Sequence, residues 1–180
     1  MRDKSILTHA KRILILGPPG AGKSTLAEKI ARATGLPLIH LDHYFFGANW
    51  AQPNPEAWRK HLEELVTQDT WVMEGQRNNL SLRTMRADVV IYLDLPLVLC
   101  LWRVVKRRLR THHTPRSSKR EDCPEVITWP FFKYALTFNA KRSWMLETIF
   151  SQPGERHVIV LGSPNDVEAF EREELLPSPF

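Results

Sequence analysis

The chain has 180 residues, of which 43% are hydrophobic and 25% are charged, and its formal net charge is +5. This composition is typical of a globular domain and excludes fibrous and disordered chains. The first residues are charged and lack an apolar secretory segment, and the longest apolar run, residues 89–102, is short and interrupted by Asp94 and Pro96. We therefore expect one cytoplasmic domain over residues 1–180, with no membrane as a partner.

The two cysteines, Cys100 and Cys123, are not spaced as in zinc sites or disulfide frameworks. Cys100 lies in an apolar run, where a cysteine is most often a core residue. We expect no metal site and no disulfide from this pair.

Positive charge is concentrated in residues 102–120, which hold eight Lys or Arg residues and no Asp or Glu. Of the 25 basic residues, the other 17 are outnumbered by the 20 acidic residues of the chain. The basicity is therefore a local feature, which suits nucleic acid, an acidic membrane surface or a small phosphorylated ligand.

Apolar runs alternate along the chain with amphipathic stretches, which predicts an α/β fold around a parallel sheet. Several of these runs lack internal alternation, as expected of strands that are covered on both faces. The predicted strands are residues 12–16, 37–41, 70–74, 88–94 and 156–161.

Helices are predicted between these strands from capping residues and apolar spacing. The first covers residues 23–33 and stops at Gly35, and the second has Asn54 as its N-cap and Pro55 at its first position. The apolar stripe of the second helix consists of Trp58, Leu62 and Leu65.

A third long helix is predicted from Pro96 onward, followed by a proline-containing loop at residues 111–130 and an aromatic-rich helix at residues 131–149. The residues of the helix that starts near Pro96 form two stripes at helical spacing, one apolar and expected to be buried, the other basic. The apolar stripe is Leu97, Leu101 and Val104, and the basic stripe is Arg103, Arg107 and Arg110.

The stretch GPPGAGKST, between the first strand and the first helix, satisfies the pattern G-x-x-x-x-G-K-[ST]. Glycines allow backbone N–H groups to surround a phosphate, a lysine reaches the β- and γ-phosphates, and a serine hydroxyl binds Mg²⁺. We therefore expect a nucleoside triphosphate to be bound here. The residues concerned are Gly17, Pro18, Pro19, Gly20, Ala21, Gly22, Lys23, Ser24 and Thr25.

Acidic residues stand at the carboxyl ends of three predicted strands, where ligands bind in such sheets. They are Asp42, Glu74 and Asp94. Each is a candidate for holding the shell of the magnesium ion or for taking a proton from an acceptor, and the alternative is a cap on a loop or helix. For Asp94 we favour the capping role.

The combined pattern resembles the adenylate kinase-like small-molecule kinases and, more closely, the bacterial DNA topology modulation proteins. The blocks that carry the resemblance are GPPGAGKST, HLDHYFFGANW with PEAW, WVMEGQRN, ADVVIYLDLPLVLCLWRVVKRRL and CPE. The resemblance implies a three-layer P-loop NTPase fold with a five-stranded parallel sheet of order 2-3-1-4-5 and helices on both faces. It also implies a basic lid at residues 108–130.

Donor-side roles follow from the same resemblance. Glu74 becomes the metal-binding acid beside the phosphate loop, although the family usually has aspartate there. Arg103 and Arg107 match the arginine pair that packs on adenine and contacts phosphate; a solvated basic helix face is the alternative. Gly162 matches the position whose backbone lies against adenine, and a plain turn glycine is the alternative.

On the acceptor side, Asp42 looks like the acid at the same strand end in kinases of hydroxyl acceptors. Arg77 lies one residue from the position of the monophosphate-binding arginine of adenylate kinases, so an AMP-specific site is not expected. The remaining candidates are Phe45, Phe46 and Trp50 as pocket walls, and Arg116, Arg120 and Arg142 as arginines that close over the phosphates.

The resulting hypothesis is an ATP- and Mg²⁺-dependent phosphotransferase acting on a small-molecule acceptor. The catalytic residues are expected to be Lys23, Asp42, Arg103 and Arg107. Two alternatives stay open: an ATP-binding protein that contacts nucleic acid through residues 102–120, and an ATPase whose acceptor is water.

Overall fold

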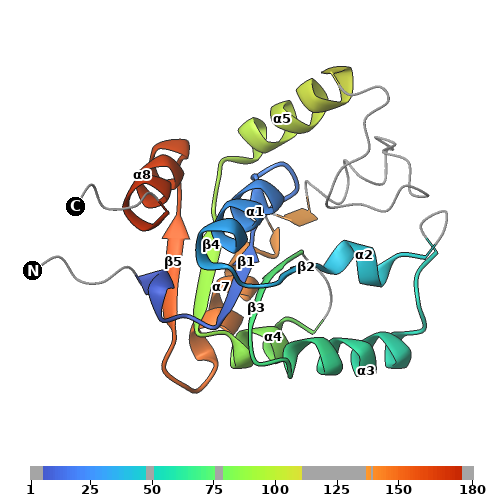
Figure 1. Cartoon of the computed structure of the whole chain (residues 1–180). Coiled ribbons are helices and arrows are strands. Elements are labelled where there is room, and N and C mark those ends of the chain that lie inside the picture. Colours follow the sequence, from blue (N-terminus) through green and yellow to red (C-terminus); the bar gives the residue numbers. More distant parts are fainter. Residues whose placement is uncertain (1–5, 48–50, 76–78, 111–136, 139, 176–180) are drawn as a thin grey trace, which may run out of the picture.

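The structure is a computed structural model that describes residues 6–47, 51–75, 79–110, 137–138 and 140–175. In the described residues, five parallel strands form one sheet of order β2-β3-β1-β4-β5, which confirms the expected order (Figure 1). The strands are β1 (Arg12–Leu16), β2 (Leu38–His40), β3 (Trp71–Glu74), β4 (Val89–Leu93) and β5 (His157–Leu161).

Helices cover both faces of this sheet, as expected of a three-layer α/β fold (Figure 1). They are α1 (Lys23–Thr34), α2 (Leu41–Phe45), α3 (Pro55–Val66), α4 (Leu80–Arg86), α5 (Leu97–Arg110), α7 (Arg142–Ser151) and α8 (Pro164–Glu174), with a short 3₁₀ turn η1 (Ile6–Thr8). None of the helices in the described part of the chain has the length and apolarity that crossing a membrane demands.

The central strands are apolar because successive side chains enter two different cores. Leu14 of β1 and Val90 of β4 belong to one core together with residues of α3, α4 and α7. Ile13 of β1 and Val89 of β4 belong to the other, together with residues of α1, α5 and α8. Because successive side chains of a strand point to opposite faces and both faces are covered, positions on both faces are apolar and no alternation of apolar and polar residues is seen in the sequence.

The second helix has the predicted start and the predicted stripe. The side chain of Asn54 accepts hydrogen bonds from the amides of Glu56 and Ala57, and Pro55 is the first residue of α3. Trp58, Leu62 and Leu65 are all buried.

The stripe predicted for the third helix is only partly correct. Val104 is buried, but Leu97 and Leu101 are only half-buried, and Cys100 is the fully buried residue of this face. Burial of Cys100 agrees with its expected place in the core, and its backbone lies directly against the phosphate loop. The side chain of Arg110 lies outside the described residues.

Of the predicted aromatic helix, the structure shows α7 from Arg142 onward, and residues 131–136 lie outside the described part. The loop predicted at residues 111–130, which forms most of the expected lid, also lies outside it. The lid therefore remains a prediction.

Candidate functional site

The loop from Gly17 to Gly22 joins β1 to α1 at the carboxyl edge of the sheet. Gly17 (φ +142°) and Gly20 (φ +84°) have left-handed backbone conformations, and a Cβ atom added to them would lie 2.6 Å from the carbonyl oxygen of Leu93 and 2.3 Å from that of Cys100. Both positions therefore require glycine on grounds of conformation and of space. The loop packs tightly against the end of β4 and against α5.

Helix α1 begins directly at Lys23, and its N-cap Gly22 provides no side-chain oxygen for the first amides. These amides and the positive end of the helix dipole are the features that bind phosphate at helix N-termini. The Nζ atom of Lys23 donates a hydrogen bond to the carbonyl oxygen of Pro18 at 2.9 Å, so its side chain reaches back across the loop. Ser24 is half-buried and Thr25 is exposed in the same turn.

Glu74 lies at the end of β3, next to the phosphate loop, and its side chain is in contact with two other elements. Ser24 donates a hydrogen bond from Oγ to Oε1 of Glu74 at 3.1 Å. Nδ1 of His40, at the end of β2, is 2.8 Å from the same oxygen. Burial alone would raise the pKa of Glu74, but the hydrogen bond from His40 and the charge of Lys23 together hold this pKa below its usual value.

Asp94, at the end of β4, has a different environment. Arg142 of α7 binds it through two hydrogen bonds, from Nε to Oδ1 at 2.7 Å and from its terminal nitrogen to Oδ2. This pair joins the sheet to α7 and agrees with a structural role for Asp94. Arg142 is thereby engaged with Asp94, whereas Arg116 and Arg120 lie outside the described residues.

Asp42 lies in the first turn of α2, beside the turn that follows Glu74. Gly75 has φ +126°, and a Cβ atom added there would lie 3.6 Å from Oδ1 of Asp42. The half-buried carboxylate of Asp42 is thus a neighbour of the residue that directly follows Glu74. Two of the three strand-end acids, Asp42 and Glu74, are thus neighbours of Gly75 at this edge of the sheet.

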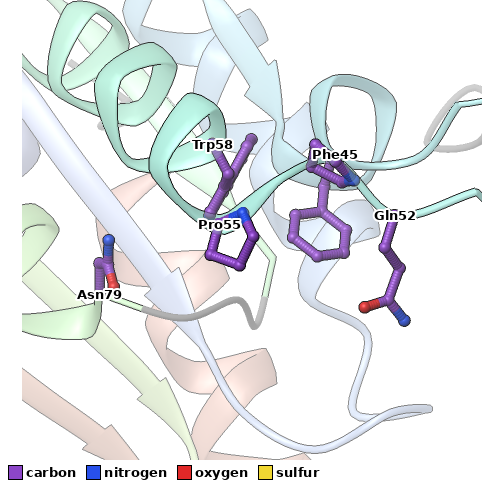
Figure 2. Close-up of a pocket in the computed structure, with 6 residues that line it drawn as sticks. Phe45, Gln52, Pro55, Trp58 and Asn79 are labelled. Atoms are coloured by element: carbon purple, nitrogen blue, oxygen red, sulfur yellow. The ribbon is translucent and has the colours of Figure 1, made fainter.

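A small hollow of about 90 Å³ opens one helical turn away from Asp42, lined by Phe45, Gln52, Pro53, Pro55, Trp58 and Asn79. Figure 2 shows the rings of Phe45 and Pro55 at its centre, with the amide groups of Gln52 and Asn79 to either side. Phe45 packs edge-on against Trp58 and Phe46, with ring centroids 4.9 and 5.0 Å apart. Of the predicted pocket walls, Phe45 lines the hollow, Phe46 supports it, and Trp50 lies outside the described residues, as does Arg77.

Arg103, the first residue of the basic stripe of α5, contacts the phosphate loop. Arg103 donates a long hydrogen bond of 3.4 Å from its guanidinium group to the carbonyl oxygen of Ala21. Arg107 follows one turn later and is half-buried. The helix therefore places guanidinium charge beside the loop that is expected to hold phosphates.

The comparisons with known proteins agree with this architecture. A family model described as an AAA domain matches residues 13–123, which is more than half of the chain. The chain belongs to this AAA domain family. The match includes β1 to β4, the phosphate loop, Asp42 and Glu74.

A curated shikimate kinase from Rhodococcus jostii (strain RHA1) is 32% identical to this AAA domain protein over 101 residues, 48% of this chain and 60% of that protein. The chain thus matches somewhat less than two thirds of that relative's length. A shikimate kinase from Acinetobacter baumannii in complex with shikimate has a TM-score of 0.59 at 17% identity, over 93% of this chain and 92% of that one. A gluconokinase from Sinorhizobium meliloti 1021 has a TM-score of 0.50 at 18% identity, over 92% and 89%. These structures share the P-loop kinase fold.

Gly162 lies beyond the AAA domain match, between β5 and α8. Its amide donates a hydrogen bond of 3.0 Å to Oδ2 of Asp166, next to the capping box that Ser163 forms at the start of α8. An added Cβ atom would make only ordinary contact with Asp166, so no steric reason requires glycine here. The geometry agrees with a turn glycine, and an adenine contact remains a prediction.

Two residues of the AAA domain were missed by sequence reasoning. His40 contacts Glu74. Its place at the end of the predicted strand 37–41, two residues before Asp42, could have indicated that His40 belongs to the site. Arg83 of α4 is fully buried and donates a hydrogen bond of 2.8 Å from Nη1 to the carbonyl oxygen of Gly75. Nothing in the local sequence distinguishes Arg83 from the exposed Arg86 of the same helix.

Proposed function

We propose that the protein is a phosphotransferase that uses ATP and Mg²⁺ to phosphorylate a hydroxyl group of a small molecule. The observation that carries this proposal is the proximity of two acids with different surroundings at one sheet edge. Glu74 is hydrogen-bonded to Ser24 of the phosphate loop, and Asp42 lies beside Gly75, the next residue. These contacts support a donor site and an acceptor site that are adjacent.

On the donor side, the loop amides and the N-terminus of α1 bind the phosphates of ATP, and Lys23 neutralises the β- and γ-phosphates. Lys23 leaves its bond to Pro18 for this purpose, since the carbonyl oxygen is a weaker partner than a phosphate. Arg103 approaches the loop from α5, and Arg107 follows one turn later on the same helix; both are proposed to stabilise charge on the transferred group.

The residues present fit a magnesium ion. Ser24 and Glu74 offer a hydroxyl and a carboxylate, which are the oxygen ligands that Mg²⁺ prefers. The lowered pKa of Glu74 keeps this carboxylate ionised at neutral pH. Bound magnesium would neutralise phosphate charge, and Ser24 and Glu74 are the residues that would hold it or its water shell.

On the acceptor side, Asp42 accepts a hydrogen bond from the attacking hydroxyl group and takes its proton as the new O–P bond forms, while the bond between the γ-phosphorus and the β–γ bridging oxygen breaks and ADP leaves. The remainder of the acceptor lies toward the hollow beside Phe45, one turn further along α2. The names of the similar proteins, shikimate kinase and gluconokinase, support a small molecule as the acceptor.

The alternative of a nucleic-acid-associated protein, as in the DNA topology modulation family, rests on residues 102–120. The structure describes this stretch only up to residue 110. Within the described part, Arg103 donates its hydrogen bond to the phosphate loop. The phosphotransferase accounts for more of the described residues.

A panel of acceptors tests the proposal. Thermal unfolding is measured with Mg²⁺ and a non-hydrolysable ATP analogue plus shikimate, gluconate, other sugars and sugar acids, nucleosides or nucleotides, and ADP release is then assayed for each compound that stabilises the protein. We expect the ATP analogue alone to raise the melting temperature and one class of hydroxyl compound to raise it further and to stimulate ADP release. ADP release at the same rate without any acceptor would instead identify an ATPase, and no stabilisation by the analogue would contradict the proposal.

A further inference from the structure

His40 is a buried polar residue at the carboxyl end of β2, a strand whose other residues are apolar. In the parallel pairing of β2 with β3, His40 is the register partner of Glu74, so the two side chains emerge level with each other. Their side-chain exposures are 10% and 6%, and Nδ1 of His40 lies 2.8 Å from Oε1 of Glu74. An interaction this sheltered from water is not a surface ion pair.

The chemistry of the contact fixes the direction of the hydrogen bond. An ionised carboxylate only accepts hydrogen bonds, so Nδ1 of His40 carries a proton and its N–H donates a hydrogen bond to Oε1 of Glu74. The proton occupies the lone pair of Nδ1, and this nitrogen therefore does not act as a metal ligand.

Both hydrogen bonds that Glu74 accepts in the described structure end on the same oxygen. Ser24 reaches Oε1 from the phosphate loop, and His40 reaches it from β2. Two donors on Oε1 restrict the orientation of the carboxylate. Neither of these two hydrogen bonds involves Oε2. The bond from His40 does not depend on the phosphate loop, so it persists when Ser24 turns toward a cation.

We propose that His40 is a positioning residue for the divalent cation: it holds Oε1 of Glu74 so that Oε2 is directed at the magnesium ion or its water shell. This inference rests on the proposed function, because it assumes that Glu74 and Ser24 hold the cation of Mg·ATP. Glutamate has one more rotatable bond than the aspartate that is usual at this position, so its carboxylate is less fixed by its own side chain. The hydrogen bond from His40 on β2 restricts this extra freedom.

The experiment compares nucleotide affinity with and without the cation and does not use turnover. The dissociation constant of the ATP analogue is measured by calorimetry in saturating Mg²⁺ and in EDTA, and the ratio reports how strongly the protein uses the cation. His40→Leu removes the donor, whereas His40→Asn places an amide N–H where Nδ1 was. His43→Leu is the control, since it removes a second imidazole whose ring centroid is 5.4 Å from that of His40.

We expect His40→Leu to lose about tenfold or more of the enhancement by Mg²⁺, with affinity in EDTA unchanged, and we expect His40→Asn and His43→Leu to retain it. Melting curves verify folding, and His40→Ala serves as a second donor-free variant. Full enhancement in His40→Leu, an equal loss in EDTA, or an equal loss in His40→Asn would overturn the inference. Absence of nucleotide binding by the unsubstituted protein would contradict the proposed function itself, which separates the two failures.

Discussion

Ser24 and Glu74 are 50 residues apart in the sequence and are joined by a hydrogen bond of 3.1 Å between Oγ and Oε1. The bond connects the first turn of α1 to the end of the neighbouring strand β3. It holds the hydroxyl and the carboxylate together beside the phosphate loop, where we propose that they serve the cation of Mg·ATP.

Lys23 is expected to be essential for nucleotide binding. Replacement by Ala removes the charge that faces the phosphates and should weaken the affinity for Mg·ATP by about 10- to 100-fold, as measured by calorimetry. Lys29→Ala is the matched control, because Lys29 lies on the same helix and pairs with Glu171 at the surface. Equal affinities of the two variants would argue against the phosphate role of the loop.

Asp42 is expected to act on the acceptor rather than on ATP. Asp42→Asn keeps the size of the side chain but accepts no proton, so kcat for the acceptor found in the panel should fall by about 10²- to 10⁴-fold while ATP affinity stays unchanged. The steady-state rate of ADP release gives kcat, and calorimetry gives the affinity. Asp69→Asn, at an exposed position before β3, should behave like the unsubstituted protein. A kcat that survives in Asp42→Asn removes the residue from the mechanism.

Arg83 is expected to stabilise the turn after β3. Arg83→Met leaves the carbonyl oxygen of Gly75 without its donor in a buried place, which should lower the free energy of unfolding by about 2 kcal/mol. Arg86→Met makes the same chemical change at an exposed position of the same helix and should have little effect. Urea unfolding of both variants gives the comparison, and similar midpoints would show that the Gly75 contact contributes nothing.

Asp88 provides a prediction about pH. Partial burial would raise its pKa, but hydrogen bonds from the Arg12 guanidinium and from the amides of Arg12 and Lys11 hold it below the usual value. A group with a lowered folded-state pKa contributes stability above its unfolded pKa, about 4, and loses it as the pH falls through the folded pKa.

Asp88→Asn should therefore be less stable than the unsubstituted protein at pH 7, by at most about 1 kcal/mol because the pair is partly exposed to solvent. The difference should disappear as the pH is lowered well below 4, since both proteins then lack the charge. Urea unfolding across this range measures it. A difference that stays constant with pH would mean that the substitution acts through packing rather than through charge.

Sequence reasoning predicted those parts of the molecule that depend on local patterns. The strands follow from apolar runs, the start of α3 from Asn54 and Pro55, and the loop from its glycines and Lys23. These features need only neighbouring residues, so a single sequence contains the information.

The strand order agrees with the resemblance, but the contacts that complete the site depend on strand register and side-chain packing, which are properties of the whole fold. His40 meets Glu74 only because β2 pairs with β3 in one register, and Arg142 meets Asp94 across 48 residues. The face of α5 that is most deeply buried contains Cys100, as expected, but not Leu97 and Leu101, and it lies against a loop that is distant in the sequence. Helical spacing predicts that α5 has an apolar stripe, but it does not determine which residues of the helix face the core.

The contact between Gly20 and Cys100 also has a mechanical meaning. A methyl group at Gly20 would lie 2.3 Å from the carbonyl oxygen of Cys100 and 2.9 Å from a methyl group of Val104, so the loop and the helix touch through backbone without a compressible side chain between them. The close approach leaves no free space between the two segments at this point, so the position of the phosphate loop is tied to that of α5, the helix that carries Arg103 and Arg107.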